Sequence, residues 1–127
     1  MSIFNIDNWL KWLKMEDNAF NKLPINGIVG LISNESREDI LIIYRTEDAV
    51  NIRVSKIQEE TRNPVVDIVF VIAYRHFDLI LNSDFSQFIN LVDENLITAS
   101  PLISVEKLQT RNYLEFIGLA GLTIKIE

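Results

Sequence analysis

The chain has 127 residues, a length that suits one domain, and 48% of them are hydrophobic. Eighteen acidic against twelve basic residues give a formal net charge of −6, which repels nucleic acid and anionic lipid head groups. Cysteine is absent, so disulfides, thiolate nucleophiles and cysteine-based zinc sites are excluded. We therefore expect one acidic domain over residues 1–127, with no cofactor, no metal and no nucleic-acid partner.

The sequence indicates neither secretion nor membrane insertion. Its N-terminus lacks the charged segment and the continuous apolar run of a secretory signal. No apolar run approaches the roughly 20 residues that span a bilayer. We therefore expect a soluble, cytoplasmic protein without stable membrane insertion, and its negative charge favours a basic protein partner.

The first quarter of the chain predicts two helical segments. Asn5 or Asp7 can cap a first helix at its N-terminus. The apolar stripe of this helix consists of Ile6, Leu10 and Leu13, with Trp9 and Trp12 at its flanks. Asn18 then starts a short helical turn, which Pro24 ends because the residue before a proline avoids the α conformation.

Strands are predicted next, over residues 27–33, 39–45 and 50–57. The third of them alternates apolar and polar residues, which indicates one wet face, as at the edge of an antiparallel sheet. The polar stretch 58–64 predicts a loop. Residues 68–72 are apolar at every position, so we expect a central strand that is covered on both faces.

The second half of the chain is mainly helical. A helical period begins at Tyr74, and Asp84 caps a further helix. Residues 96–104 are extended with a proline inside, which favours an edge strand. Ser104 caps a last helix that continues through Gly118 or beyond.

The order of these elements predicts an α+β fold. We expect a single mixed, mostly antiparallel sheet of about five strands, with helices packed on one face. Residues 122–127 predict either a short strand or a loose tail.

The last predicted helix has apolar side chains on two sides. A helical wheel that starts at Val105 and advances about 100° per residue separates two apolar groups. One side holds Leu108, Phe116, Leu119 and Ala120, and the other holds Leu114 and Ile117. Such a helix either lies sandwiched in the core or turns one face to a ligand cavity or a partner.

Candidates for chemistry are few, and each has a simpler structural interpretation. His76 is the single histidine, but no serine, cysteine or metal ligand is fixed near it by spacing, so a partly exposed surface histidine is simpler. Asp67 begins an apolar strand, where burial would raise the pKa of its carboxyl group. The simpler interpretation is that this carboxylate caps the strand end in solvent. The residues that could transfer a proton are Asp67, Tyr74, His76, Asp78 and Tyr113.

The order of elements resembles the sterol carrier protein type-two family of lipid-binding domains. The matching stretches are residues 26–30 and 67–70 for two strands, residues 77–81 for the helix that follows, and Asp84 with Phe88 for the next helix. The family's glycine-rich turn after that helix, Gly-Lys-Leu-x-Val-x-Gly-Asp, is replaced by Asn-Leu-Ile-Thr-Ala-Ser-Pro over residues 95–101.

This resemblance implies a five-stranded mixed sheet with helices around an apolar tunnel for a lipid, sterol, isoprenoid or polyketide-like molecule. The residues that it places in the tunnel wall are Phe77, Leu81, Phe85, Phe88, Ile89, Val92, Phe116, Ile117 and Leu119. The simpler interpretation is that these side chains fill the core.

Three functions remain open. The first is a non-catalytic domain that binds or carries an apolar small molecule. The second is an accessory enzyme of the cyclase or isomerase type, which uses the same tunnel and one of the proton-transfer candidates. The third is a small acidic immunity or interaction protein that covers a basic partner, which requires carboxylates clustered on one face and no internal cavity.

Overall fold

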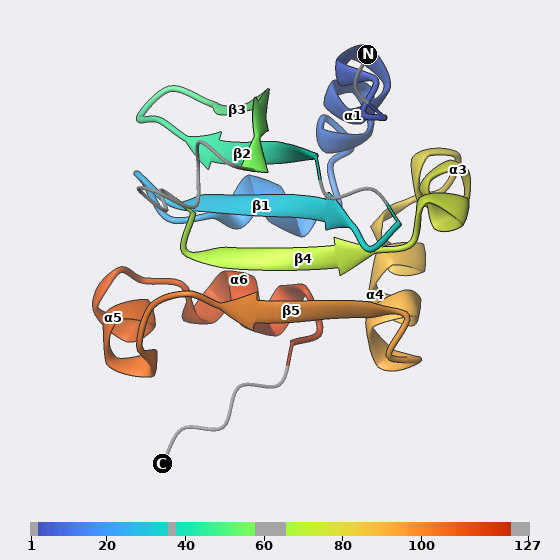
Figure 1. Ribbon diagram of the computed structural model, residues 1–127. Helices are drawn as coiled ribbons and strands as arrows, with labels where there is room; N and C mark the ends of the chain where they lie inside the picture. Colours follow the sequence, from blue (N-terminus) through green and yellow to red (C-terminus); the bar gives the residue numbers. More distant parts are fainter. Residues whose placement is uncertain (1–2, 36–37, 58–65, 123–127) are drawn as a thin grey trace.

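The structure is a computed structural model that describes residues 3–35, 38–57 and 66–122. It is built around one five-stranded sheet (Figure 1). Its strands are β1 (Ile28–Ser33), β2 (Asp39–Arg45), β3 (Val50–Lys56), β4 (Ile68–Ile72) and β5 (Ile97–Pro101). They lie in the order β3-β2-β1-β4-β5, in which β1 and β4 are parallel and the other neighbouring pairs are antiparallel. The predicted α+β class with one mixed sheet is confirmed, and so are the edge positions of β3 and β5.

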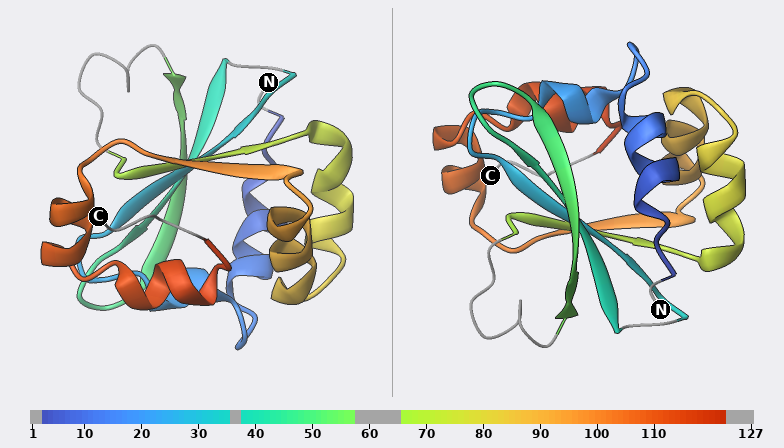
Figure 2. Two further views of the ribbon diagram at one scale, coloured as in Figure 1. Left: turned by 90° about the horizontal axis from the view of Figure 1, so that it is seen from below. Right: turned by 90° about the horizontal axis from the view of Figure 1, so that it is seen from above.

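The helices lie mainly on one side of this strongly twisted sheet (Figure 2). The α-helices are α1 (Ile6–Leu13), α3 (Phe77–Leu81), α4 (Phe85–Asp93), α5 (Val105–Thr110) and α6 (Leu114–Leu119). The 3₁₀ helices of the described ranges, η1 and η2, span Ala19–Lys22 and Tyr74–His76. Within the described ranges, no helix is both long enough and apolar enough to cross a membrane.

The predicted helix starts are confirmed because each depends on a local hydrogen bond. Asn5 accepts from the N–H of Asn8 at 3.1 Å, which decides between the two candidate caps of α1. The side chains of the other predicted caps, Asn18, Asp84 and Ser104, accept from backbone N–H groups in the same way. Such caps satisfy N–H groups that have no partner within the helix.

The prediction of one continuous last helix is wrong, because α5 and α6 are separate. Asn112 follows α5 with a φ of 67°, in the left-handed region that asparagine tolerates better than most residues. The N–H of Tyr113 donates to the carbonyl of Leu108 at 2.9 Å, which completes a Schellman motif. Residues 114–119 therefore do not follow the helical wheel that starts at Val105.

Helix α1 turns a different face to the core from the one predicted. Trp9, Trp12 and Leu13 are buried, whereas Ile6 is 44% exposed. The two indoles bury more apolar surface than an isoleucine, and their burial sets the rotation of the helix.

Strand β4 is an interior strand, as predicted, but one of its faces is covered only in part. Ile68, Phe70 and Ile72 are buried, while Val69 and Val71 are half-buried. The predicted cover on both faces is therefore complete on one face and partial on the other. On that second face the sheet carries a smaller buried cluster, formed by Ile40, Ile42 and Val66.

Aromatic rings fill the space between the sheet and the helices. The ring of Phe20, from η1, lies with its centroid 5.3–5.9 Å from the centroids of Trp12, Phe70, Phe85, Phe88 and Phe116. None of these six side chains is more than 2% exposed. We call these six residues the aromatic core. Their contacts join α1, η1, β4, α4 and α6 into one packed unit.

Two predictions concern residues outside the described ranges. The loop predicted at 58–64 lies there, and so does the predicted strand or tail at 122–127 apart from Leu122.

Candidate functional site

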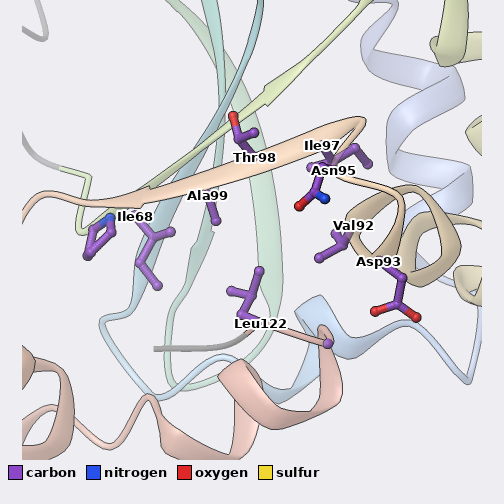
Figure 3. A pocket seen from close by; sticks show the side chains of 10 residues that line it. Ile68, Val92, Asp93, Asn95, Ile97, Thr98, Ala99 and Leu122 are labelled. Atoms are coloured by element: carbon purple, nitrogen blue, oxygen red, sulfur yellow. The ribbon is translucent and has the colours of Figure 1, made fainter. Parts of the chain in front are cut away.

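A hollow of about 360 Å³ lies beside β5, where that strand faces the ends of α4 and α6 (Figure 3). Its described lining is apolar at Ile68, Val92, Ile97, Ala99, Pro101, Gly121 and Leu122. Three polar residues complete it, namely Asp93, Asn95 and Thr98. We call this site the β5 hollow.

A small side chain on β5 borders this space, and a left-handed glycine lies at its other side. Ala99 pairs in register with Phe70, so a methyl group lies on β5 beside a large ring on β4. Gly121 has no side chain, and its φ of 75° lets the chain turn back after α6. Two of the apolar lining residues, Ile68 and Ile97, are almost completely covered by other residues, at 1% and 2% exposed.

The end of α4 supplies the polar side of the β5 hollow. Asn95 follows the helix with a φ of 62°, and the N–H of Leu96 donates to the carbonyl of Leu91 at 2.9 Å, so this end is also a Schellman motif. In Figure 3 the side chains of Val92 and Asn95 project from the helix end towards Ala99. The side chain of Thr98 lies on the opposite side of β5 (Figure 3), as the alternation of a strand requires.

A second group of polar residues is buried near the start of β4. Asp67 is 4% exposed and accepts from the Tyr113 hydroxyl at 2.5 Å and from Nη1 of Arg111 at 2.8 Å. The same hydroxyl accepts from the N–H of Ile28 at 2.8 Å, and Nη2 of Arg111 donates to the carbonyl of Asn26 at 2.9 Å. We call Asp67, Arg111 and Tyr113 the Asp67 network. It ties the connection between α5 and α6 to the starts of β1 and β4.

The Asp67 network corrects the simpler interpretation of Asp67. This carboxylate does not cap the strand end in solvent but is buried against a tyrosine and an arginine. Burial, together with the hydrogen bond to Asp67, raises the pKa of the Tyr113 hydroxyl far above its ordinary value of about 10. Because Tyr113 is 0% exposed, a substrate cannot reach its hydroxyl without local opening, and the network serves to position elements.

The other three proton-transfer candidates lie beyond the opposite end of β4. Tyr74 and Asp78 are exposed and line a hollow of about 220 Å³ along α1, together with Trp9 and Phe77. His76 is partly exposed, as predicted, and its Nδ1 atom is buried without a hydrogen-bond partner among the described residues. The five candidates are therefore divided between two places and do not form one catalytic group.

The nine residues predicted to line a tunnel are divided between the interior and the surface. Five are buried in or beside the aromatic core, namely Phe77, Phe85, Phe88, Phe116 and Ile117. Ile89 is half-buried, and Leu119 is 44% exposed on α6. A guest between the helices and the sheet would have to displace aromatic rings.

Three of the nine border hollows at the surface. Val92 lines the β5 hollow. Phe77 and Leu81 line the hollow along α1, and Leu81 also lines a neighbouring one of about 160 Å³. The sequence did not predict the other residues that line the β5 hollow. Ala99, Asn95 and Gly121 are small or polar, so they do not stand out in a pattern of large apolar residues. The predicted absence of a metal site stays a prediction, and the described residues contain no group of three metal-ligating side chains.

Together, the sheet and the β5 hollow define a small α+β domain with an open, partly apolar site at one sheet edge. No protein-family model, curated protein or solved structure matches this chain. Its function is therefore argued from its own residues.

Proposed function

We propose that this chain is a non-catalytic binding domain for a small apolar molecule, which it holds in the β5 hollow. The observation that carries the proposal is a space of about 360 Å³ over the buried side chains of Ile68 and Ile97. Sites for small molecules are usually concave and mainly apolar, with volumes of about 300–1,000 Å³. The β5 hollow is near the lower end of this range, so its guest is compact.

The lining of the β5 hollow supports binding rather than catalysis. Asp93 is the single titratable side chain among its described residues, and it is exposed at the rim. None of the five proton-transfer candidates is among these described lining residues. An enzyme of the cyclase or isomerase type needs an acid or base within hydrogen-bond reach of its substrate, and the hollow offers one carboxylate in water.

The resemblance to the sterol carrier protein type-two family supports the same class of ligand, an apolar small molecule. We propose a related arrangement of sheet and helices, with one difference in where the guest lies. The guest rests at the edge of β5, beside Ala99 and Leu122, and the space between sheet and helices belongs to the aromatic core.

A titration with cyclohexylmethanol, followed by NMR of the methyl groups, tests this proposal. We expect saturable shifts at Val92, Ala99 and Leu122. Ala99→Leu fills the hollow and is expected to weaken binding by at least about tenfold. The matched control is Ser100→Leu, which adds a similar side chain at an exposed position of the same strand, outside the described lining, and should bind like the wild type.

Two results contradict the proposal. One is equal binding by the wild type and Ala99→Leu. The other is the absence of saturable binding by the wild type. Native mass spectrometry of the purified chain then identifies the natural guest, as a mass that Ala99→Leu loses and Ser100→Leu retains.

A further inference from the structure

We infer that the natural guest of the β5 hollow carries a protonated amine next to its apolar body, and that Asp93 and Asn95 hold this group. The inference rests on the proposed function, since it names the polar part of the same guest. Three observations carry it: the charges of the lining, the end of α4 and the position of the Asn95 carboxamide.

The described lining of the β5 hollow carries one charge, and that charge is negative. Asp93 contributes a carboxylate, and no lysine, arginine or histidine is among the described residues of the wall. Asp93 is exposed, and among the described residues it forms no ion pair. An ammonium group gains from this carboxylate, whereas a carboxylate guest is repelled by it.

The C-terminal end of α4 makes the electrostatic potential in the β5 hollow more negative. This nine-residue helix ends at Asp93, and its last turn contains no basic residue. The C-terminal end of a helix carries a partial negative charge of about half an elementary charge, which favours cations near the last turn. Because the whole chain has a net charge of −6, its longer-range field also attracts cations.

The carboxamide of Asn95 completes the polar side. It projects from the left-handed residue after α4 towards the apolar wall (Figure 3). Its oxygen accepts a hydrogen bond from an ammonium group, and its NH₂ group can donate to a hydroxyl group. The Asn95 amide can therefore hydrogen-bond to a neutral or a cationic guest. The Asp93 carboxylate is the group that favours the cationic guest.

Three probes with one skeleton test the inference: cyclohexylmethylamine, cyclohexylmethanol and cyclohexanecarboxylate. Their dissociation constants are measured at pH 7 and low salt for the wild type, Asp93→Asn and Glu94→Gln. We expect the wild type to bind the amine about fivefold more tightly than the alcohol, because exposed charge pairs contribute up to about this factor. The carboxylate should bind most weakly.

The two variants remove the same charge from adjacent positions, but Glu94 is not among the described lining residues. Asp93→Asn should abolish the preference for the amine, because the amine loses more affinity than the alcohol when the carboxylate is removed. Glu94→Gln should keep most of that preference. Added salt should reduce the preference in the wild type, since the charges are exposed.

The outcomes separate this inference from the proposed function. If the alcohol binds as tightly as the amine, or if both variants lose the preference equally, the inference is overturned while the binding site stands. If none of the three probes binds the wild type, the proposed function itself fails.

Discussion

The aromatic core and the β5 hollow lie on the same face of the same sheet, yet one is filled and the other is open. Above Phe70 of β4, rings from η1, α4 and α6 lie with their centroids 5.6–6.3 Å from the Phe70 centroid. Beside it on β5, Ala99 offers one methyl group, and the chain opposite is at Gly121. The difference follows the size of the side chains on neighbouring strands, where the ring of Phe70 pairs in register with the methyl group of Ala99.

The largest expected loss of stability comes from removing a ring of the aromatic core. Phe88→Ala should lower the free energy of unfolding by about 3–5 kcal/mol, because it removes a ring with 0% exposure and leaves a cavity. Leu119→Ala is the control, since Leu119 is 44% exposed and its loss should cost within about 0.5 kcal/mol. Urea unfolding of both variants measures the difference. Equal costs would show that the core already holds a void, as a tunnel requires.

A smaller loss is expected from opening the Asp67 network. Asp67→Ala leaves a buried tyrosine hydroxyl and an arginine without their partner, so we expect a loss of about 2–3 kcal/mol. The exposed Glu115, on α6, provides a control through Glu115→Ala. Because the network positions α6, whose end leads to Gly121, Asp67→Ala should also weaken binding in the β5 hollow. A variant that keeps wild-type stability would show that the network contributes nothing to the fold.

The pH dependence of stability follows from the raised pKa of Tyr113. In the unfolded chain this hydroxyl loses its proton near pH 10, whereas in the folded chain it keeps it to higher pH. The folded state therefore binds more protons above pH 10, and stability falls there by up to about 1.4 kcal/mol per pH unit. Below about pH 10 the stabilisation that depends on the protonated Tyr113 hydroxyl is fully present.

Tyr113→Phe lacks this hydroxyl and should lose less stability between pH 9 and 11 than the wild type. Unfolding free energies at both pH values, compared between the two proteins, isolate the effect from the titration of other groups. An identical fall in both proteins would show that the hydroxyl is already ionised or accessible in the folded state.

The smallest expected change in stability comes from placing a larger side chain in the β5 hollow. Ala99→Leu should alter the free energy of unfolding by within about 1 kcal/mol, because the β5 hollow accepts the added carbons. The same change at Ala19, which is 4% exposed in η1, should cost about 1–3 kcal/mol through overpacking. If both substitutions cost the same, the β5 hollow is not open in solution.

The parts of the fold that depend on local chemistry could be predicted from the sequence. The N-caps at Asn5, Asn18, Asp84 and Ser104 bind N–H groups two or three residues away. The edge position of β5 agrees with its proline, which cannot donate a hydrogen bond within a central strand. The break between α5 and α6 also had a local signal, Asn112, but its neighbours continue the helical pattern and concealed it.

The candidate site could not be predicted, because its parts are distant in the sequence. Asp67 meets Arg111 and Tyr113 across 44 and 46 positions, and no pattern connects them. The β5 hollow lies beside Ala99, and a small residue gives no sign in the sequence of whether a neighbour fills the space next to it. If the hollow proves to bind no small molecule, the acidic chain retains the prediction of a basic protein partner.

The most direct test is to locate a bound probe by NMR, through intermolecular nuclear Overhauser effects from cyclohexylmethanol to the protein. We expect contacts to the methyl groups of Val92, Ala99 and Leu122, and none to the rings of Phe85, Phe88 and Phe116. Contacts to those rings would place the guest inside the aromatic core and contradict the division between a filled interior and an open sheet edge.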